Sequence, residues 1–405
     1  MSTAVPPTLR PPEASRGPKG IAGLAQELAL LLACCAHVSE VEKQERITEI
    51  LRQPPQWDRV LQLTQNHGVM PQVFGQLCQV GTLIPSNTLD ELRKMYGTNV
   101  RQNLWMTGEL LRNIEHLEAR DVEAMPYKGP VLAEMLYDDI GMRQFGDLDI
   151  LIRSKDVLRA KAVMSKLGYE TSLELTPQQE RAYVDSGYEF SFRGGRNRNL
   201  VEIQWRVLPR FYAVDFSMED FFRRKVPQSV AGQWVRTLCL EDLTLVLGVH
   251  AAKHVWVKLA WLCDFAALVA SSKVKWPQVQ EEARRLGVER ILFMNFFLAH
   301  KLLGVEPPLQ IQPQEGAELE KLAAEILPII VQGVEYNTES PAYFRLMMKL
   351  RERRKDRIRF FWRLASTPST GEWATIKLPG FLFPFYRGVR LFRLARRFLW
   401  GAPRS

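Results

Sequence analysis

The chain has 405 residues, of which 46% are hydrophobic and 24% are charged, and this composition is typical of a globular protein with more than one domain. Its five cysteines lack the spacing of metal ligands, and its first residues lack an apolar core, which argues against a disulfide-rich secreted protein. The most apolar early stretch, "IAGLAQELALLLACCA", is too short to span a bilayer. We therefore expect a cytoplasmic protein.

The predicted elements divide the chain into five regions. Residues 1–20 are rich in proline and charge and are expected to form a disordered tail, and helical apolar spacing follows over 21–120. Short strands and helices alternate over 121–210, and the pattern is helical again over 211–340. Residues 341–405 form a basic amphipathic tail.

The alternating region contains a recognisable order of elements. "VEAMPY" predicts a short strand, "PVLAEMLY" a helix, "DLDILIR" a second strand, and "SKDVLRAKAVMSKLGY" a helix that ends at Gly168. "GYEFSFRGGRNRNLVEIQWRV" predicts a hairpin, because two alternating runs are joined by a turn rich in Gly and Asn. The expected fold class is therefore α+β, with a small mixed sheet between helical regions.

Two aspartates stand at the start of the second strand. Residues i and i+2 of a strand point to the same face, so Asp147 and Asp149 would present adjacent carboxylates, which repel unless a cation lies between them. Mg²⁺ or Mn²⁺ prefers such oxygen ligands. Glu202 would add a third carboxylate if its hairpin strand lies beside this one. The alternative is that the aspartates merely begin a strand.

The order of these motifs resembles the polymerase-β-like nucleotidyltransferase superfamily and, more narrowly, the bacterial family of uncharacterised nucleotidyltransferases. "YKGPVLAEMLY", "RQFGDLDILI", "WDRVLQLTQNHGVMPQV" and "VHAAKHVWVKLAWLCDFAAL" carry the resemblance, which extends from about residue 21 to 300. It implies transfer of a nucleoside monophosphate from an NTP to an acceptor that the motifs do not identify. In this reading Asp147, Asp149 and Glu202 hold the metal ions.

The phosphate-binding turn departs from the superfamily pattern. Lys128, Gly129 and Pro130 stand where Gly-Ser or Gly-Gly is usual, and proline offers no amide hydrogen. Lys128 is then expected to contact a β- or γ-phosphate, with Gly129 permitting close backbone approach.

Two further positions near the strands stand out. Arg143 lies in a long connection and is a candidate phosphate clamp, the alternative being a surface ion pair with Asp138 or Asp139. Gln204 occupies a position where the family resemblance implies a histidine.

The segment "EDLTLVLGVHAAKHVWVKLAWLCDFAALVASS" predicts one buried helix. His250 and His254 are four residues apart and share a face, but a zinc protease motif would require glutamate at Ala251. Lys253, His254 and Asp264 are candidate contacts for the nucleotide or the acceptor. The alternative is a buried histidine pair satisfied by hydrogen bonds.

The net charge of +9 is concentrated at the C-terminal end. Residues 351–405 carry 14 Lys and Arg against three Asp and Glu. In "FYRGVRLFRLARRFLW" one helical sector contains Leu391, Phe392, Leu394, Ala395, Phe398 and Leu399, and the opposite one contains Arg390, Arg393 and Arg397. Residues 351–400 thus predict contact with an anionic membrane surface or a nucleic acid, the alternative being a docked helix with a solvated arginine face.

Two other classes of function therefore stand beside the enzyme. One is a catalytically inert binding module with the nucleotidyltransferase fold. The other is a polyanion- or membrane-surface-binding protein that acts through its basic tail and is membrane-associated within the cytoplasm.

Overall fold

The computed structural model describes residues 25–171, 173–195, 199–311, 316–334, 336–338, 340–368, 373, 378 and 380–400, without the side chains of 380, 381, 384 and 394–400. The predicted tail of residues 1–20 lies outside these residues. None of the helices within the described ranges combines the length and the apolar composition needed to cross a membrane.

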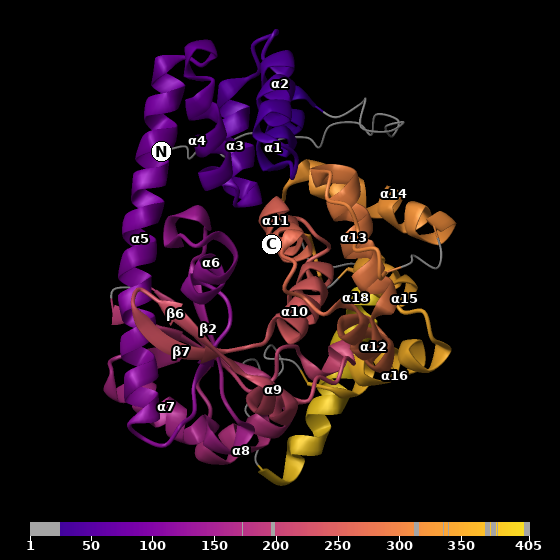
Figure 1. The fold of residues 1–405 in the computed structure, drawn as a ribbon. Coiled ribbons are helices and arrows are strands. Elements are labelled where there is room, and N and C mark those ends of the chain that lie inside the picture. Colours follow the sequence, from indigo (N-terminus) through magenta and orange to yellow (C-terminus); the bar gives the residue numbers. More distant parts are fainter. Residues whose placement is uncertain are drawn as a thin grey trace, which may run out of the picture.

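A group of helices forms the N-terminal part, as the apolar spacing predicts. The longest of them, α5, runs along one side of the molecule and connects this group to the sheet (Figure 1). The bounds are α1 Gln26–Cys35, α2 Glu40–Ile50, α3 Trp57–His67, α4 Met70–Gln79 and α5 Ser86–Glu118.

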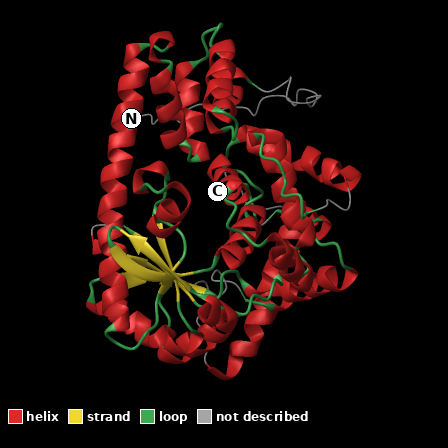
Figure 2. Cartoon of the chain, in the orientation of Figure 1, coloured by secondary structure: helices red, strands yellow, loops and turns green. Residues whose placement is uncertain are grey.

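A mixed five-stranded sheet lies at the other end of α5, and helices surround it (Figure 2). The strand order is β1-β2-β5-β4-β3, in which only β2 and β5 are parallel neighbours. The predicted strand, helix, strand, helix and hairpin are all present, and α8 is an additional helix before the hairpin. The elements are β1 Met125–Pro126, α6 Pro130–Tyr137, β2 Asp147–Leu151, α7 Val157–Lys166, β3 Glu170–Thr171, α8 Pro177–Ser186, β4 Glu189–Arg193 and β5 Leu200–Gln204. The α+β fold class is confirmed.

A second hairpin interrupts the region that the sequence predicts to be helical. After α9 (Met218–Arg224), strands β6 (Val226–Val230) and β7 (Gln233–Thr237) pair antiparallel. Ala231 and Gly232 form their turn with φ of 48° and 79°, and two positive φ values are typical of a tight hairpin turn. The Ala-Gly pair is a weaker turn signal than Asn-Gly, which explains why periodicity alone overlooked it.

The predicted single buried helix is wrong, because the chain forms two helices there. α10 (Leu240–Lys253) ends before His254, and α11 (Leu259–Ala270) begins after a short connection. Val255 and Trp256 have φ of 55° and 50°, and consecutive left-handed residues cannot continue a right-handed helix. Such backbone is costly for a β-branched or bulky residue, and here it lies beside the cleft described below.

The remaining helices complete the C-terminal part, which lies across from the sheet (Figure 1). They are α12 Trp276–Leu286, α13 Glu289–Leu303, α14 Gly316–Gln332, α15 Pro341–Lys349, α16 Arg354–Ser366 and α18 Tyr386–Trp400. One apolar core joins these helices to the N-terminal group, and a second lies around the sheet. The site lies where the two parts meet.

Candidate active site

The parallel pairing of β2 with β5 brings the three predicted carboxylates together. Asp149 is the register partner of Glu202, and Asp147 precedes it by two residues on the same face. Leu148 and Ile150 point the other way and are buried in the core. The predicted neighbourhood of Asp147, Asp149 and Glu202 is thus present in the sheet.

Polar side chains lie among these carboxylates. Lys128 Nζ donates to Asp149 Oδ1 over 3.1 Å. Gln204 Nε2 lies 3.0 Å from Asp149 Oδ1, 2.9 Å from Glu202 Oε2 and 3.3 Å from Oε2 of Glu189, a fourth carboxylate on β4. Tyr127 holds the other end of the Gln204 amide by donating to its Oε1 over 2.7 Å.

The concentration of carboxylates shifts their proton affinities. Burial, together with repulsion from Glu189 and then Asp149, raises the pKa of Glu202 to about 8. Burial and the adjacent Asp149 also raise the pKa of Asp147. At Lys128 burial acts to lower the pKa, but the attraction of Asp149 and its neighbours outweighs it, so the pKa is raised and the amine stays charged. The crowded carboxylates therefore hold protons more tightly than usual, although Lys128, Arg143 and Lys253 oppose this shift.

Two observations bear on whether these residues fit a divalent metal ion. Asp149 Oδ2 is buried without a hydrogen-bond partner, and such an oxygen is costly unless a cation or donor meets it. Among the residues that the structure describes, however, no three His, Cys, Asp or Glu side chains converge as a ready metal cage, and the Gln204 amide lies between the carboxylates. The chemistry of the donors fits Mg²⁺, while the cage would require the Gln204 amide to turn aside.

Gly129 provides the close backbone contact at the start of α6. Its φ is 57°, and a Cβ atom there would lie 3.4 Å from the carbonyl oxygen of Asp147. A side chain would therefore be strained by the backbone angle and crowded by β2. This contact fixes the Lys128 segment against the first residue of the strand.

Arg143 is buried and forms an ion pair across the domain. Its Nε donates to Asp264 Oδ2 over 3.1 Å, and Tyr137 donates to Asp264 Oδ1 over 2.9 Å. The alternative of a surface pair with Asp138 or Asp139 is therefore wrong. The polar chain connects α6, the loop before β2 and α11.

A cleft of about 800 Å³ opens beside the sheet. Asp147, Asp149, Lys128, Arg143 and His254 line it. Glu202, Gly129, Lys253 and Asp264 are not among its lining residues, so these four act on its contents only through neighbours or after a side chain moves. The predicted set thus separates into lining residues and residues directly behind them.

The two histidines and Trp261 form an aromatic wall of this cleft. The His250 and His254 ring centroids are 4.8 Å apart, and each lies within 5.3 Å of the Trp261 centroid. Burial, reinforced by Lys253, lowers the pKa of His254 to about 3, and burial with Lys128 lowers that of His250 well below its usual value. Both rings are therefore neutral near pH 7, and they pack with an indole in place of a zinc-ligand cluster.

Sequence reasoning missed Glu189, which lies at the back of the site and is attracted by the predicted Lys253. Glu189 is the register partner of Gln204, and burial raises its pKa while Tyr188 and Lys253 oppose that shift. Lys253 Nζ lies 5.8 Å from the Tyr188 ring centroid, and burial lowers its pKa against the attraction of Glu189. The alternation of "YEFSFR" places Glu189 and Ser191 on one face, which is the signal that could have identified it.

Comparisons with known proteins identify the family of the chain. Residues 53–304 match the family described as uncharacterised nucleotidyltransferases. The solution structure of the antibiotic-resistance factor ANT(2'')-Ia is similar to 45% of this chain and 91% of its own, with 13% sequence identity and a TM-score of 0.33. The comparison with curated proteins gave no match. The family match covers more than half of the chain, which therefore belongs to the uncharacterised nucleotidyltransferases.

Proposed function

We propose that the protein transfers a nucleoside monophosphate from an NTP to a hydroxyl or phosphate acceptor in a metal-dependent reaction. The observation that carries the proposal is the register of β2 and β5, which sets Glu202 opposite Asp149, directly behind the cleft that Asp147 and Asp149 line. Carboxylates crowded in this way repel one another, and a divalent cation with a bound triphosphate relieves that repulsion.

In this proposal Asp147, Asp149 and Glu202 hold Mg²⁺ or Mn²⁺. The bound metal would align the acceptor oxygen with the α-phosphorus and offset the charge of the departing pyrophosphate. The acceptor oxygen forms a bond to that phosphorus, the bond to the bridging oxygen of the β-phosphate breaks, and a carboxylate of the site takes up the acceptor proton.

The remaining residues bind and position the substrates. Lys128 and Arg143 line the cleft and both attract the Asp147 carboxylate, and we assign them to the triphosphate. Gly129 lets the backbone of the turn come close to the triphosphate, and Asp264 holds the Arg143 guanidinium in position through its ion pair. His254 forms part of the wall beside the nucleotide or the acceptor, and Lys253 balances the charge of Glu189 behind it.

The first test is titration calorimetry of the purified protein with each NTP in Mg²⁺. The matched variants are Asp147→Asn plus Asp149→Asn, which keep side-chain shape, and Asp121→Asn, an exposed aspartate with positive φ that Asn also tolerates. Binding of one NTP that the double variant loses and Asp121→Asn keeps would support the proposal. Metal-dependent binding that survives the double substitution would overturn it.

A catalytically inert nucleotide-binding module is the competing proposal, and the Gln204 amide favours it by lying within hydrogen-bond distance of three carboxylates. If that amide permanently replaces a cation, NTP will bind equally with Mg²⁺ and with a chelator present. Gln204→Ala would then weaken NTP binding with or without Mg²⁺, because it removes the donor between the carboxylates. An enzyme instead requires the metal for binding.

A further inference from the structure

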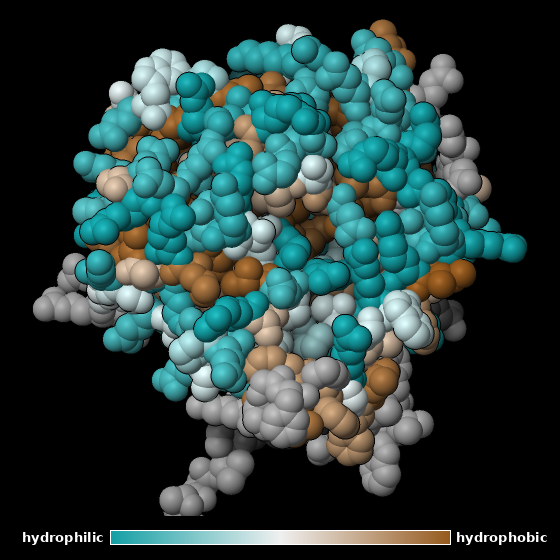
Figure 3. Space-filling model, turned by 90° about the horizontal axis from the view of Figure 1, so that it is seen from below, coloured by the Kyte–Doolittle hydropathy of each residue, from teal (hydrophilic) through white to brown (hydrophobic). Residues whose placement is uncertain are grey.

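The last helices expose an unusual set of side chains. Within the described part of residues 351–393, every exposed residue is basic, glycine or a large apolar residue: Arg354, Lys355, Ile358, Phe361, Trp362, Phe385, Arg387, Gly388, Leu391 and Phe392. A solvated helix face is normally polar, and apolar side chains gathered on a surface indicate an interaction site. We call these ten residues the apolar-basic surface. Figure 3 views the molecule from below and shows that apolar side chains lie among hydrophilic ones on that face.

The inner face of α16 packs against the rest of the protein, so the apolar residues of its outer face are not part of the core. Asp356, Phe360 and Leu364 are buried beneath the helix. Ile358, Phe361 and Trp362 follow the i, i+3, i+4 spacing of a single helical face, and Trp362 is 71% exposed. The helix is therefore apolar on two sides, of which the protein covers one.

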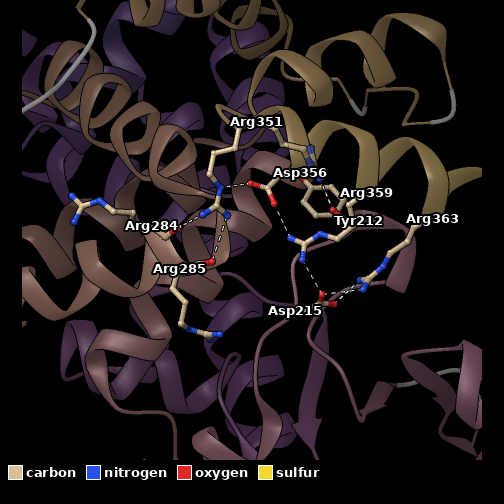
Figure 4. Close-up of polar contacts among 9 residues, drawn as sticks. Tyr212, Asp215, Arg284, Arg285, Arg351, Asp356, Arg359 and Arg363 are labelled. Carbon is tan, nitrogen blue, oxygen red and sulfur yellow. Dashed lines mark hydrogen bonds and ion pairs between the residues drawn. The ribbon is translucent and has the colours of Figure 1, made fainter.

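Ion pairs fix α16 in this orientation (Figure 4). Arg359 bridges Asp356 over 3.0 Å and Asp215 over 3.3 Å, and Arg363 pairs with Asp215 over 3.0 Å. Arg351 donates to the backbone of Tyr212 and Met347. These arginines are paired with carboxylates or backbone carbonyls of the same chain, while Arg354 and Lys355 are exposed.

α18 packs against α16 and has exposed basic and apolar side chains of its own. The alternative of a helix docked on its own protein agrees with this packing, but its solvated arginine face is wrong for the part described: Arg390 is buried and donates to the carbonyl of Leu364 over 3.2 Å, while Leu391 and Phe392 are exposed. The predicted face residues Leu394, Ala395, Phe398 and Leu399, and Arg397 opposite, lie outside the described side chains.

We propose that the apolar-basic surface docks the protein peripherally on an anionic lipid bilayer. Aromatic and aliphatic side chains next to lysine and arginine match the boundary between acyl chains and anionic headgroups. No exposed carboxylate lies in the described part of residues 351–393 to oppose such a surface. The inference does not rest on nucleotidyl transfer.

The side chains favour a bilayer over other occupants. A nucleic acid would use aromatic rings for stacking, but the aliphatic Ile358 and Leu391 offer no stacking plane. A second copy of the chain would bring the same basic residues against Arg354, Lys355 and Arg387, and like charges repel at an interface. A bilayer offers acyl chains to the apolar residues and anionic headgroups to the basic ones.

The test is co-sedimentation of the full chain with vesicles of phosphatidylcholine, with and without roughly 30% phosphatidylserine. We expect binding only to the anionic vesicles, weaker at high salt. Trp362→Ser should reduce that affinity roughly fivefold or more because it removes buried apolar area. The matched control is Trp234→Ser on β7, where the tryptophan is 74% exposed and outside the surface, and its affinity should equal the wild type.

Other outcomes would overturn the inference. The first two are the absence of binding to either vesicle and an equal loss of vesicle affinity in the two tryptophan variants. A third is a dimer, detected by light scattering, that Trp362→Ser dissociates while no vesicle binding is seen. The fourth is binding of single-stranded RNA in place of vesicles. Both substitutions remove exposed side chains, so both variants should fold. NTP titration of each variant shows whether the nucleotide site is intact independently of membrane docking.

Discussion

Asp149 and Glu202 face each other across the parallel ladder between β2 and β5. Because paired residues of neighbouring strands point to the same face, this register places the buried carboxylate of Asp149 beside the partly buried one of Glu202 and adds Asp147 two residues earlier. A slip of one residue would turn Glu202 into the core, where Val201 and Ile203 are buried. The hydrophobic pattern that fixes the strand therefore also fixes the acidic cluster.

Glu202→Gln should reduce nucleotidyl transfer on the order of a hundredfold or more, because it removes one of three proposed metal ligands. NTP affinity should change less, since Lys128 and Arg143 remain. Steady-state kinetics with the NTP and acceptor that the calorimetric screen identifies would measure both. Glu170→Gln, an exposed glutamate on β3 of the same sheet, is the control and should leave the rate unchanged.

The stability of the metal-free protein should fall as pH rises from about 4.5 to about 8. The pKa of Glu202 is raised from 4.5 to about 8, so the folded chain keeps a proton that the unfolded chain has released. The unfolded state then binds fewer protons, and the free energy of unfolding decreases with pH across this window. His254 acts in the opposite sense below pH 6.5, because its pKa is lowered to about 3.

Thermal melting of the wild type and Glu202→Gln in a chelator would isolate the glutamate. Gln at position 202 does not titrate, so the variant does not lose stability through this deprotonation. The Tm of the variant minus that of the wild type should therefore grow with pH and reach roughly 2 °C or more near pH 8. Mg²⁺ should reduce the difference by stabilising the wild type. A Tm difference that is independent of pH would contradict the assignment.

Asp264→Asn should lower the free energy of unfolding by about 3 kcal/mol, because it leaves the buried Arg143 guanidinium without its counter-charge. It should also weaken NTP binding by releasing Arg143 from its position on the cleft wall. Urea unfolding and calorimetry would measure the two effects. Asp90→Asn breaks an exposed pair with Arg93 and should cost only about 0–1 kcal/mol.

The local patterns predicted much of the sheet that carries the candidate site. The alternation in "DLDILI" and in the hairpin indicated which side chains share a face, and the structure places Asp147, Asp149 and Glu202 accordingly. Glu189 and the Gln204 bridge depend on which residues of different strands face one another, and this pairing is a tertiary property. The same limit applies to the ion pair of Arg143 with Asp264, whose partners are 121 residues apart.

The helical segments show a second limit. Apolar periodicity cannot place a break inside a run that is buried all round, so α10 and α11 read as one helix although Val255 and Trp256 turn left-handed. In the tail, an amphipathic wheel cannot tell which side the protein covers. Arg390 points inward because a backbone carbonyl at the end of α16 accepts its hydrogen bond.

Gly129→Ala tests the contact between the Lys128 segment and β2. The substitution forces a side chain into φ of 57° and places its Cβ 3.4 Å from the Asp147 carbonyl, so the free energy of unfolding should fall by about 1–2 kcal/mol. NTP affinity should fall as well, because any shift of this turn moves Lys128 away from Asp149. Urea unfolding and NTP titration of the same preparation would measure both quantities.

The matched control for Gly129→Ala is Gly108→Ala in the exposed middle of α5, where nothing lies within 4 Å of the added methyl group. Alanine suits a helix better than glycine, so this variant should gain about 0.5–1 kcal/mol of stability and bind NTP like the wild type. If the same Gly→Ala change lowers the free energy of unfolding at position 129 and raises it at position 108, the backbone angle and the strand contact are the cause. If both variants gained stability, the turn at Gly129 would not require glycine.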